Sequence, residues 1–154
     1  MKLYLIQHGE ATTEEVDASR PLTAKGRTDV QKITSFLKGA GLAPMVIFHS
    51  GKTRARQTAE IIAAQLSPGC QVKERDGLAP NDPVKVLADE ISGMAGDLMI
   101  VGHLPFLAKL AAILLAGQES KNGVAFRQGA VVCLQRNPDQ IWQVAWMVTP
   151  ELLN

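Results

Sequence analysis

The sequence predicts an α/β fold, a three-layer α/β/α sandwich with a mostly parallel central sheet and a C-terminal antiparallel hairpin. Short apolar runs typical of buried strands alternate with segments whose apolar residues recur at helical spacing. Near the C-terminal end, two β-rich runs follow one another with only a polar turn between them. Strands that alternate with helices favour a parallel sheet covered on both faces.

The N-terminal half predicts strands and helices in alternation. Lys2–Gln7 is a short apolar run that ends in a loop, which indicates a strand buried on both faces. Thr23 can cap a helix that runs to about Lys38 and stops at the glycines that follow. Met45–His49 predicts a second buried strand, and Lys52–Leu66 predicts a second helix with one apolar stripe.

The middle of the chain continues the alternation. Cys70–Glu74 predicts a weaker strand. Asp82-Pro83 predicts an N-cap followed by proline at the first helical position, and hence a helix through Ile91. Leu98–Val101 predicts a third strong strand, and Leu104–Leu115 is apolar nearly all round, which indicates a buried helix.

The C-terminal hairpin is expected from Ala130–Gln135 and Ile141–Val148, which are joined by Asn137–Gln140. Trp142 and Trp146 lie in the second of these runs. We expect them to pack in the core or at the sheet edge, and a contact surface is the alternative.

Composition narrows the class of protein. The 154 residues are 46% hydrophobic and 20% charged, which is typical of one globular domain that buries roughly two-thirds of its unfolded surface. A net charge of +1 gives no overall basic field for nucleic acid or a membrane surface. Cys70 and Cys133 have no metal-type or redox spacing, so we expect two buried thiols in a reducing compartment. Neither a signal peptide nor a membrane span is expected, and we expect a cytoplasmic protein.

Three predicted strands end in residues that could form one site. His8 follows the first strand, Ser50 the second and His103 the third. In open parallel sheets, ligands bind beyond the carboxyl ends of the strands. These positions, far apart in sequence, are therefore expected to be neighbours in space.

These residue types suit phosphoryl transfer with histidine as the nucleophile. Neutral imidazole is nucleophilic near pH 7, so His8 could carry a phosphoryl group covalently. Gly9 would let the backbone approach the phosphate without a Cβ clash. Arg54 lies in the first turn of the predicted helix, whose N-terminal end attracts anions, and Ser50 could add a hydroxyl donor.

Two further residues could complete the site. Arg20 would supply a second planar guanidinium fork, and His103 a further donor opposite His8. Metal catalysis fits poorly, because no His/Cys/Asp cluster has ligand spacing. Gly51-Lys52-Thr53 resembles the end of a phosphate-binding P-loop, but the upstream glycine is missing. We expect neither metal nor cofactor.

At these residues the sequence resembles the histidine phosphatase superfamily, the phosphoglycerate mutase-like proteins. Its Arg-His-Gly motif corresponds to Gln7-His8-Gly9, and its Gly-His corresponds to Gly102-His103. A serine followed by Arg-Ala and a later threonine corresponds to Ser50, Arg54-Ala55 and Thr58. The resemblance spans about residues 2 to 148. We therefore expect residues 1–154 to form a single domain. It is strongest to the SixA-type phosphohistidine phosphatases through Arg20-Pro21-Leu22-Thr23 and His103-Leu104-Pro105.

The resemblance implies a reaction and a partner. His8 would become phosphorylated and then be hydrolysed by water, with phosphate contacts from Arg20, Arg54 and His103. In SixA-type members the substrate is a phosphohistidine on a histidine-phosphotransfer domain of a signalling relay. A catalytically silent phospho-ligand binding module and a small-molecule phosphatase of the same superfamily remain alternatives. The oligomeric state stays open.

A general acid is harder to assign. Larger relatives carry an acidic proton donor on an inserted segment, for which this chain has little room between Leu66 and Leu98. That fits a phosphoramidate substrate, whose imidazole leaving group needs less help from an acid. Glu10 and Asp82 are candidate donors, although a helix cap is the plainer account of Asp82.

Gln7 departs from the family pattern. The arginine of the motif is a charged bidentate phosphate ligand, whereas glutamine offers one neutral NH₂ group. The exchange should weaken phosphate binding by on the order of 1–2 kcal/mol. If the lost donor acts mainly in the transition state, the rate could fall by about 10²–10³. We therefore expect a working but slower phosphatase.

Overall fold

The computed structural model describes residues 1–66 and 68–154, and the strands within these residues form one sheet. The strands are β1 (Lys2–Gln7), β2 (Val46–His49), β3 (Gln71–Glu74), β4 (Leu98–Gly102), β5 (Val131–Arg136) and β6 (Trp142–Val148). Their order across the sheet is β3-β2-β4-β1-β5-β6. The first four in this order are parallel, and β5 and β6 add an antiparallel edge, which confirms the predicted sheet.

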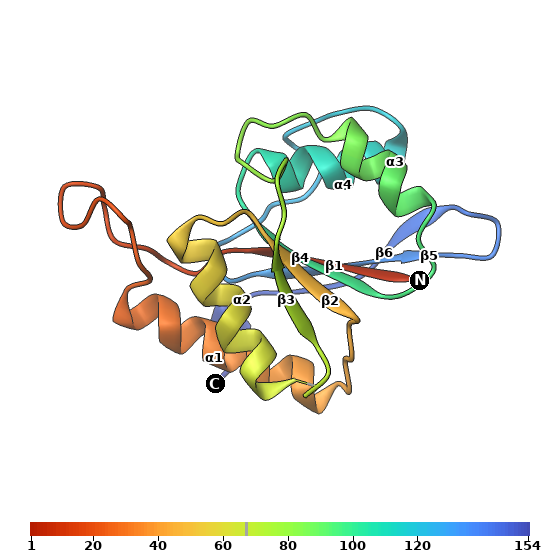
Figure 1. Ribbon diagram of the computed structural model, residues 1–154. Helices are drawn as coiled ribbons and strands as arrows, with labels where there is room; N and C mark the ends of the chain where they lie inside the picture. The colour runs from red at the N-terminus through yellow and green to blue at the C-terminus, as the bar shows by residue number, and fades with distance from the viewer. Residues whose placement is uncertain (67) are drawn as a thin grey trace.

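Helices cover both faces of the sheet, as the alternating pattern predicted (Figure 1). The helices α1 (Ala24–Gly39) and α2 (Thr53–Gln65) lie on one face. The helices α3 (Lys85–Ser92) and α4 (Phe106–Ala116) lie on the other, and a 3₁₀ turn, Pro150–Leu152, follows β6. The three-layer α/β/α sandwich is therefore confirmed.

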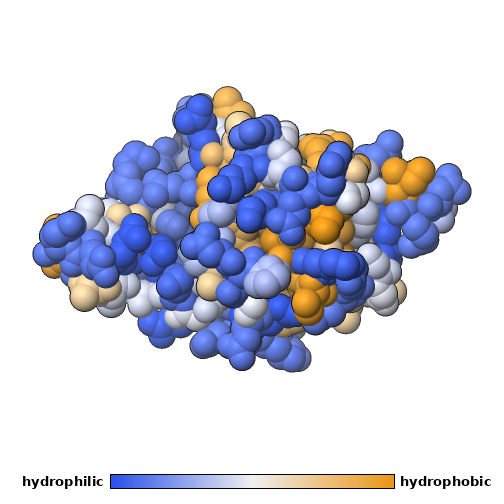
Figure 2. Space-filling model, turned by 90° about the horizontal axis from the view of Figure 1, so that it is seen from above, coloured by the Kyte–Doolittle hydropathy of each residue, from blue (hydrophilic) through white to orange (hydrophobic). Residues whose placement is uncertain are grey.

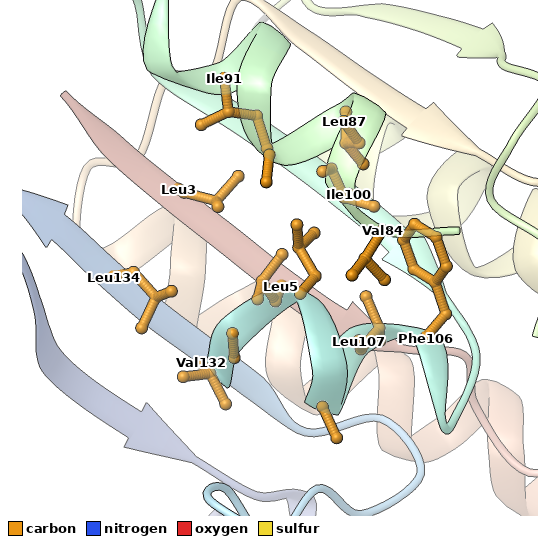
Figure 3. Packing of buried hydrophobic residues seen from close by; sticks show 14 of the residues in the cluster. Leu3, Leu5, Val84, Leu87, Ile91, Ile100, Phe106, Leu107, Val132 and Leu134 are labelled. Atoms are coloured by element: carbon orange, nitrogen blue, oxygen red, sulfur yellow. The ribbon is translucent and has the colours of Figure 1, made fainter. Parts of the chain in front are cut away.

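The residues of β1 show why this strand is an unbroken apolar run. Leu3 and Leu5 pack against α3 and α4 (Figure 3), whereas Tyr4 and Ile6 pack against α1 and α2. All four are buried, and full burial of one leucine or isoleucine contributes about 1.5–3 kcal/mol. Burial on both faces fixes β1 in the middle of the sheet, and with it the direction in which the next residues leave the strand.

The start of α1 matches the predicted cap. The hydroxyl of Thr23 accepts a hydrogen bond from the backbone N–H of Gly26 at 2.9 Å. The Thr23 backbone N–H donates to the carbonyl of Glu10 at 2.9 Å, so the helix start is tied to the loop that follows β1. The cap therefore also positions the chain just beyond His8.

Two helices begin later than the sequence predicted. Helix α3 starts at Lys85, because the Asp82 carboxylate accepts from the Ala79 backbone N–H at 2.8 Å and closes a turn before the helix. The prediction of Asp82 as the helix N-cap was wrong. Helix α4 begins at Phe106, two residues after the predicted start at Leu104.

The C-terminal hairpin is confirmed, with a bulge that the sequence did not show. Cys133 lies opposite Trp146, but Leu134 lies opposite Val144, so β6 carries one extra residue. As a result, Trp142 is buried against α3 and α4, while Trp146 packs beside Tyr4 on the other face at a centroid distance of 6.1 Å. Both tryptophans take the expected packing role.

The two thiols differ from each other. Cys133 is buried in β5 as expected, and burial raises the pKa of its thiol to about 11. Cys70 is half-buried and lies just before β3, outside the strand in which it was expected.

The face that Figure 2 shows is polar over most of its area. Seen from above, on the side of α3 and α4, hydrophilic residues surround small apolar patches (Figure 2). Within residues 1–66 and 68–154, no helix is long and apolar enough to cross a membrane.

Candidate active site

The carboxyl ends of three adjacent strands bring the two predicted catalytic histidines together. Gln7 of β1 lies opposite Gly102 of β4, so His8 and His103 follow neighbouring strands. The ring centroids of the two histidines lie 5.1 Å apart, with an angle of 52° between the planes. The exposed fractions are 7% for His8 and 2% for His103, so both rings are held inside the protein rather than on its surface.

The hydrogen bonds of His8 define its tautomer. Its Nδ1 lies 2.7 Å from the carbonyl oxygen of Gly9, and a carbonyl can only accept. Nδ1 therefore carries the proton, and Nε2 keeps its lone pair. The Nε–H of Arg54 donates to that nitrogen at 3.3 Å. The unprotonated nitrogen of a neutral imidazole thus lies directly against a guanidinium.

The backbone on either side of the His8 ring is held by side chains and strands. The Gly9 N–H donates to the hydroxyl of Thr58 at 3.0 Å, and that hydroxyl donates to the carbonyl of Arg54 at 2.8 Å. The His8 N–H donates to the carbonyl of Gly102 at 3.1 Å. The same threonine therefore connects the turn after β1 to the helix that carries Arg54.

Gly9 is required by packing against α1. A Cβ at this position would lie 2.8 Å from the Cγ2 of Val30 and 3.1 Å from the carbonyl oxygen of Gly26. Any larger residue would separate the turn from the helix. The structure thus gives a different reason for this glycine from the expected approach of phosphate.

Ser50 contacts the second histidine. Its Oγ lies 2.6 Å from the Nε2 of His103, and it accepts from the backbone N–H of Lys52 at 3.4 Å. The Nδ1 of His103 is buried without a hydrogen-bond partner among the described residues. The serine expected to contact phosphate is thus bonded to a histidine.

Arg20 reaches the site from a loop. The loop between β1 and α1 projects from the sandwich (left in Figure 1), and an isolated bridge between Ala11 and Leu22 closes its base. Arg20 has φ 48°, in the left-handed region that non-glycine residues rarely adopt, and its Nε donates to the carbonyl of Thr12 at 3.1 Å. Such a strained backbone at a polar site indicates a conformation imposed by its surroundings.

Burial and positive charge keep both histidines neutral. Burial lowers the pKa of His8 to about 4 against the opposing hydrogen bond to Gly9, and the charges of Arg54 and Arg20 lower it further. Burial lowers the pKa of His103 to about 3, with contributions from His8, Arg54, Lys52 and Arg20. The pKa of Arg54 is itself lowered, first by burial and then by Arg20. The positive charge around the two rings comes from Arg54, Arg20 and Lys52.

The comparison with known families agrees with this arrangement. A model described as the histidine phosphatase superfamily (branch 1) matches residues 3–81, which include Gln7, His8, Arg20 and Arg54. The chain belongs to that superfamily. This membership supports a hydrolase that acts as a phosphatase.

Relatives extend the match. An uncharacterized protein of Picosynechococcus sp. (strain ATCC 27264 / PCC 7002 / PR-6) is 36% identical over 126 residues, 77% of this chain and 75% of the relative. The protein histidine phosphatase SixA complexed with tungstate matches with a TM-score of 0.84 and 23% identity, over 100% of both chains. A phosphoserine phosphatase from Entamoeba histolytica in complex with 3-phosphoglyceric acid matches with a TM-score of 0.72 and 16% identity, over 96% of both chains. These two structures share the fold of this histidine phosphatase.

Gln7 of this histidine phosphatase borders a cavity beside the paired histidines. The cavity has a volume of about 620 Å³ and is also lined by Glu10 and by residues of α1 and the 126–128 segment, whereas His8, Arg20, Arg54 and His103 do not line it. The Oε1 of Gln7 is buried without a partner among the described residues.

The two candidate proton donors are engaged elsewhere. The Oε1 of Glu10 accepts from the hydroxyl of Thr23 at 2.8 Å, and Asp82 closes the turn before α3. Within the described residues, neither carboxylate is hydrogen-bonded to His8 or His103. The same part of the chain holds no group of three or more His, Cys, Asp or Glu side chains placed to bind a metal ion.

Two further residues shape the site of this histidine phosphatase without having been expected to. The N–H of Gly129, which has φ 76°, donates to the carbonyls of Gln7 and His8 at 3.0 and 3.2 Å. The Nδ1 of His49 accepts from the Gly51 N–H at 3.1 Å and holds the turn that presents Ser50. A glycine directly before a predicted strand was the available signal for Gly129, and a histidine ending a strand was the signal for His49.

Proposed function

We propose that the protein removes the phosphoryl group from a phosphohistidine on another protein, through a covalent phosphohistidine on its own His8. The observation that carries this proposal is the tautomer of His8, whose Nδ1 proton is bonded to the Gly9 carbonyl. Its Nε2 therefore keeps its lone pair, which accepts from the Nε–H of Arg54 at 3.3 Å and points the nitrogen at the group that would bind the phosphoryl oxygens.

The first step transfers the phosphoryl group. The Nε2 of His8 attacks phosphorus while the P–N bond to the substrate imidazole breaks, and the departing nitrogen takes a proton from water. The positive charge that develops on the His8 ring is stabilised by the Nδ1–H bond to Gly9. Arg54 and Arg20 stabilise the negative charge on the phosphoryl oxygens.

The second step regenerates the free enzyme. Water attacks phosphorus of phospho-His8, and the P–N bond breaks with its electron pair returning to Nε2. Phosphate leaves with one proton of the water, and the other proton neutralises the hydroxide left by the first step. A neutral His8 is regenerated, ready for the next cycle.

The positions of the two nearby carboxylates favour a substrate with an imidazole leaving group. Glu10 and Asp82 accept hydrogen bonds from Thr23 and Ala79, and among the described residues neither is hydrogen-bonded to His8 or His103. An imidazole needs less protonation to leave than an alkoxide does. The similarity to a protein histidine phosphatase adds support for a protein substrate, and a histidine-phosphotransfer domain in the cytoplasm is the partner we propose.

The test is transfer of radioactive phosphate from a phosphorylated histidine-phosphotransfer domain. We expect release of phosphate and an acid-labile label on the enzyme that is absent in His8→Ala and present in His49→Gln, a variant of the other strand-end histidine. An enzyme that binds tungstate but never takes up label would contradict the proposal. It would then favour a silent phospho-ligand binding module, which the neutral Gln7 also suits.

A small-molecule phosphatase is the second candidate enzyme, because a phosphoserine phosphatase shares the fold. The discriminating measurement compares kcat/KM for the phosphorylated phosphotransfer domain with kcat/KM for phosphoserine and 3-phosphoglycerate. We expect the protein substrate to be preferred by at least about 10²-fold, since its imidazole leaving group needs less protonation than an alkoxide does. A preference for either small phosphate would exclude the protein substrate.

A further inference from the structure

The contact between Ser50 and His103 bears on which ring nitrogen of the histidine carries the proton, as well as on the position of the ring. The Oγ of Ser50 lies 2.6 Å from the Nε2 of His103 and accepts the backbone N–H of Lys52 at 3.4 Å. A serine hydroxyl has one proton to donate and can accept two hydrogen bonds. With an acceptor position used by Lys52, the hydroxyl proton is available to the imidazole.

We infer that Ser50 donates to the Nε2 of His103 and thereby places the ring proton of that histidine on Nδ1. A neutral imidazole has one donor and one acceptor nitrogen, and the bond made by one nitrogen decides the state of the other. Ser50 is in this view a positioning residue, not the phosphate ligand that the sequence led us to expect.

The consequence is an unused donor beside the nucleophile. The Nδ1 of His103 is buried, has no partner among the described residues, and belongs to a ring whose centroid is 5.1 Å from that of His8. An unpaired buried donor is unfavourable, and an incoming acceptor removes that cost. On the proposed function, that acceptor is an oxygen of the phosphoryl group attacked by His8.

The tautomer matters because the ring is neutral. Burial lowers the pKa of His103 to about 3, so near pH 7 the ring has a single N–H. In the opposite tautomer, Nδ1 would present a lone pair to a phosphoryl oxygen and repel it. A charged ring would donate from both nitrogens, and Ser50 would have no such effect.

The experiment is ¹⁵N NMR of the histidine side chains, which distinguishes a protonated from an unprotonated ring nitrogen. In the wild type at pH 7, we expect the proton of His103 on Nδ1. In Ser50→Ala, the proton should redistribute to Nε2 while the His8 signals stay unchanged. Ser50→Thr, which keeps the hydroxyl, should restore the wild-type pattern, and Ser92→Ala, whose hydroxyl bonds within α3, serves as the matched control.

Affinity for tungstate gives the second readout. We expect Ser50→Ala to bind tungstate about tenfold more weakly and Ser50→Thr to bind it within about twofold of the wild type, since one hydrogen bond to a charged group is at stake. A wild-type His103 protonated on Nε2, or an unchanged tautomer in Ser50→Ala, would overturn the inference. The wild-type spectrum alone decides the matter if Ser50→Ala does not fold.

The two proposals fail separately. Absence of a phosphoryl label on His8, with the His103 proton on Nδ1, would remove the enzymatic function but leave the donor inference intact for a binding module. A labelled His8 with the His103 proton on Nε2 would do the reverse.

Discussion

The two arginines of the site are held in opposite ways. Arg54 lies in the first turn of α2, half-buried, with its Nε–H donating to the Nε2 of His8. Arg20 lies on the projecting loop, in a left-handed conformation, with its Nε bonded to the carbonyl of Thr12 in that loop. The difference separates a framework half of the site from a loop half. The framework half comprises His8, Ser50, Arg54, Thr58 and His103; the loop half comprises Glu10 and residues 11–22.

The comparison teaches which part of the chemistry is built into the fold. In the framework half, His8 is aligned by hydrogen bonds to Gly102, Gly9 and Arg54, which belong to a strand, a tight turn and a helix. A group held within a fraction of an ångström contributes fully to transition-state stabilisation. The loop half is held within itself by the hydrogen bond from Arg20 to Thr12 and by the Ala11–Leu22 bridge.

The framework half should make stability depend on pH, which is the largest effect we expect. The pKa values of His8 and His103 are about 4 and about 3 in the folded protein, below the ordinary 6.5. Below pH 6.5 the unfolded chain takes up protons that the folded protein does not, so stability is complete above pH 6.5 and falls toward pH 4. The loss is roughly 1.4 kcal/mol per pH unit and per histidine, several kcal/mol in all.

Urea unfolding at pH 7, 6, 5 and 4.5 measures this dependence. His103→Gln should flatten it, because the imidazole with a folded-state pKa of about 3 is then absent. An unchanged slope in that variant would mean that other groups cause the pH dependence.

The second effect compares the two arginines directly. Arg54→Ala should lower kcat/KM for the phosphorylated phosphotransfer domain by about 10²–10³, since a fixed donor at the reacting phosphoryl group is lost. Arg20→Ala should lower it by only about tenfold, because a loop side chain is less well aligned. Equal or reversed losses would show that the loop is as rigid as the helix under turnover.

The third effect tests the link between turn and helix. Thr58→Val leaves the buried Gly9 N–H without its acceptor and should lower the free energy of unfolding by about 1–3 kcal/mol, with a several-fold loss of kcat. Thr34→Val is the matched control, since Thr34 is equally buried but bonds only the Val30 carbonyl within α1. A loss of kcat in Thr34→Val as large as in Thr58→Val would argue against a specific role for Thr58.

The smallest effect concerns Gln7, on the border of the framework half. Gln7→Arg should strengthen tungstate binding by about tenfold, because a charged fork replaces a neutral amide. The measurement is isothermal titration against the wild type. An unchanged affinity would mean that residue 7 faces only the cavity shared with Glu10.

Burial patterns made the framework half largely predictable. Where strands and helices alternate, an apolar run such as Lys2–Gln7 is interpreted as a buried strand. Because ligands bind beyond the carboxyl ends of parallel strands, His8, Ser50 and His103 were then expected to lie together. Periodicity says nothing about hydrogen bonds between distant elements. The bond from Ser50 to His103 and the use of Asp82 in a turn were therefore beyond reach of the sequence.

Tertiary packing explains the other differences between the sequence predictions and the structure. Gly9 was expected to admit phosphate, but only the packed helix α1 reveals the contact that forbids a side chain there. The bulge in β6 depends on pairing with β5, which a single run of residues cannot encode. The orientation of Gln7 depends likewise on the end of β1 and on the loop before β5, where the N–H of Gly129 donates to the Gln7 carbonyl.

That bulge also gives the protein a pair of optical reporters. The chain contains two tryptophans, and the extra residue in β6 puts one on each side of the sheet. Trp142 lies beneath the guanidinium of Arg136 on the α3/α4 side, and Trp146 lies beside Phe36 on the α1 side. In Trp146→Phe the fluorescence comes from one layer, and in Trp142→Phe from the other. The order in which the two layers of the sandwich come apart on heating can thus be followed by emission alone.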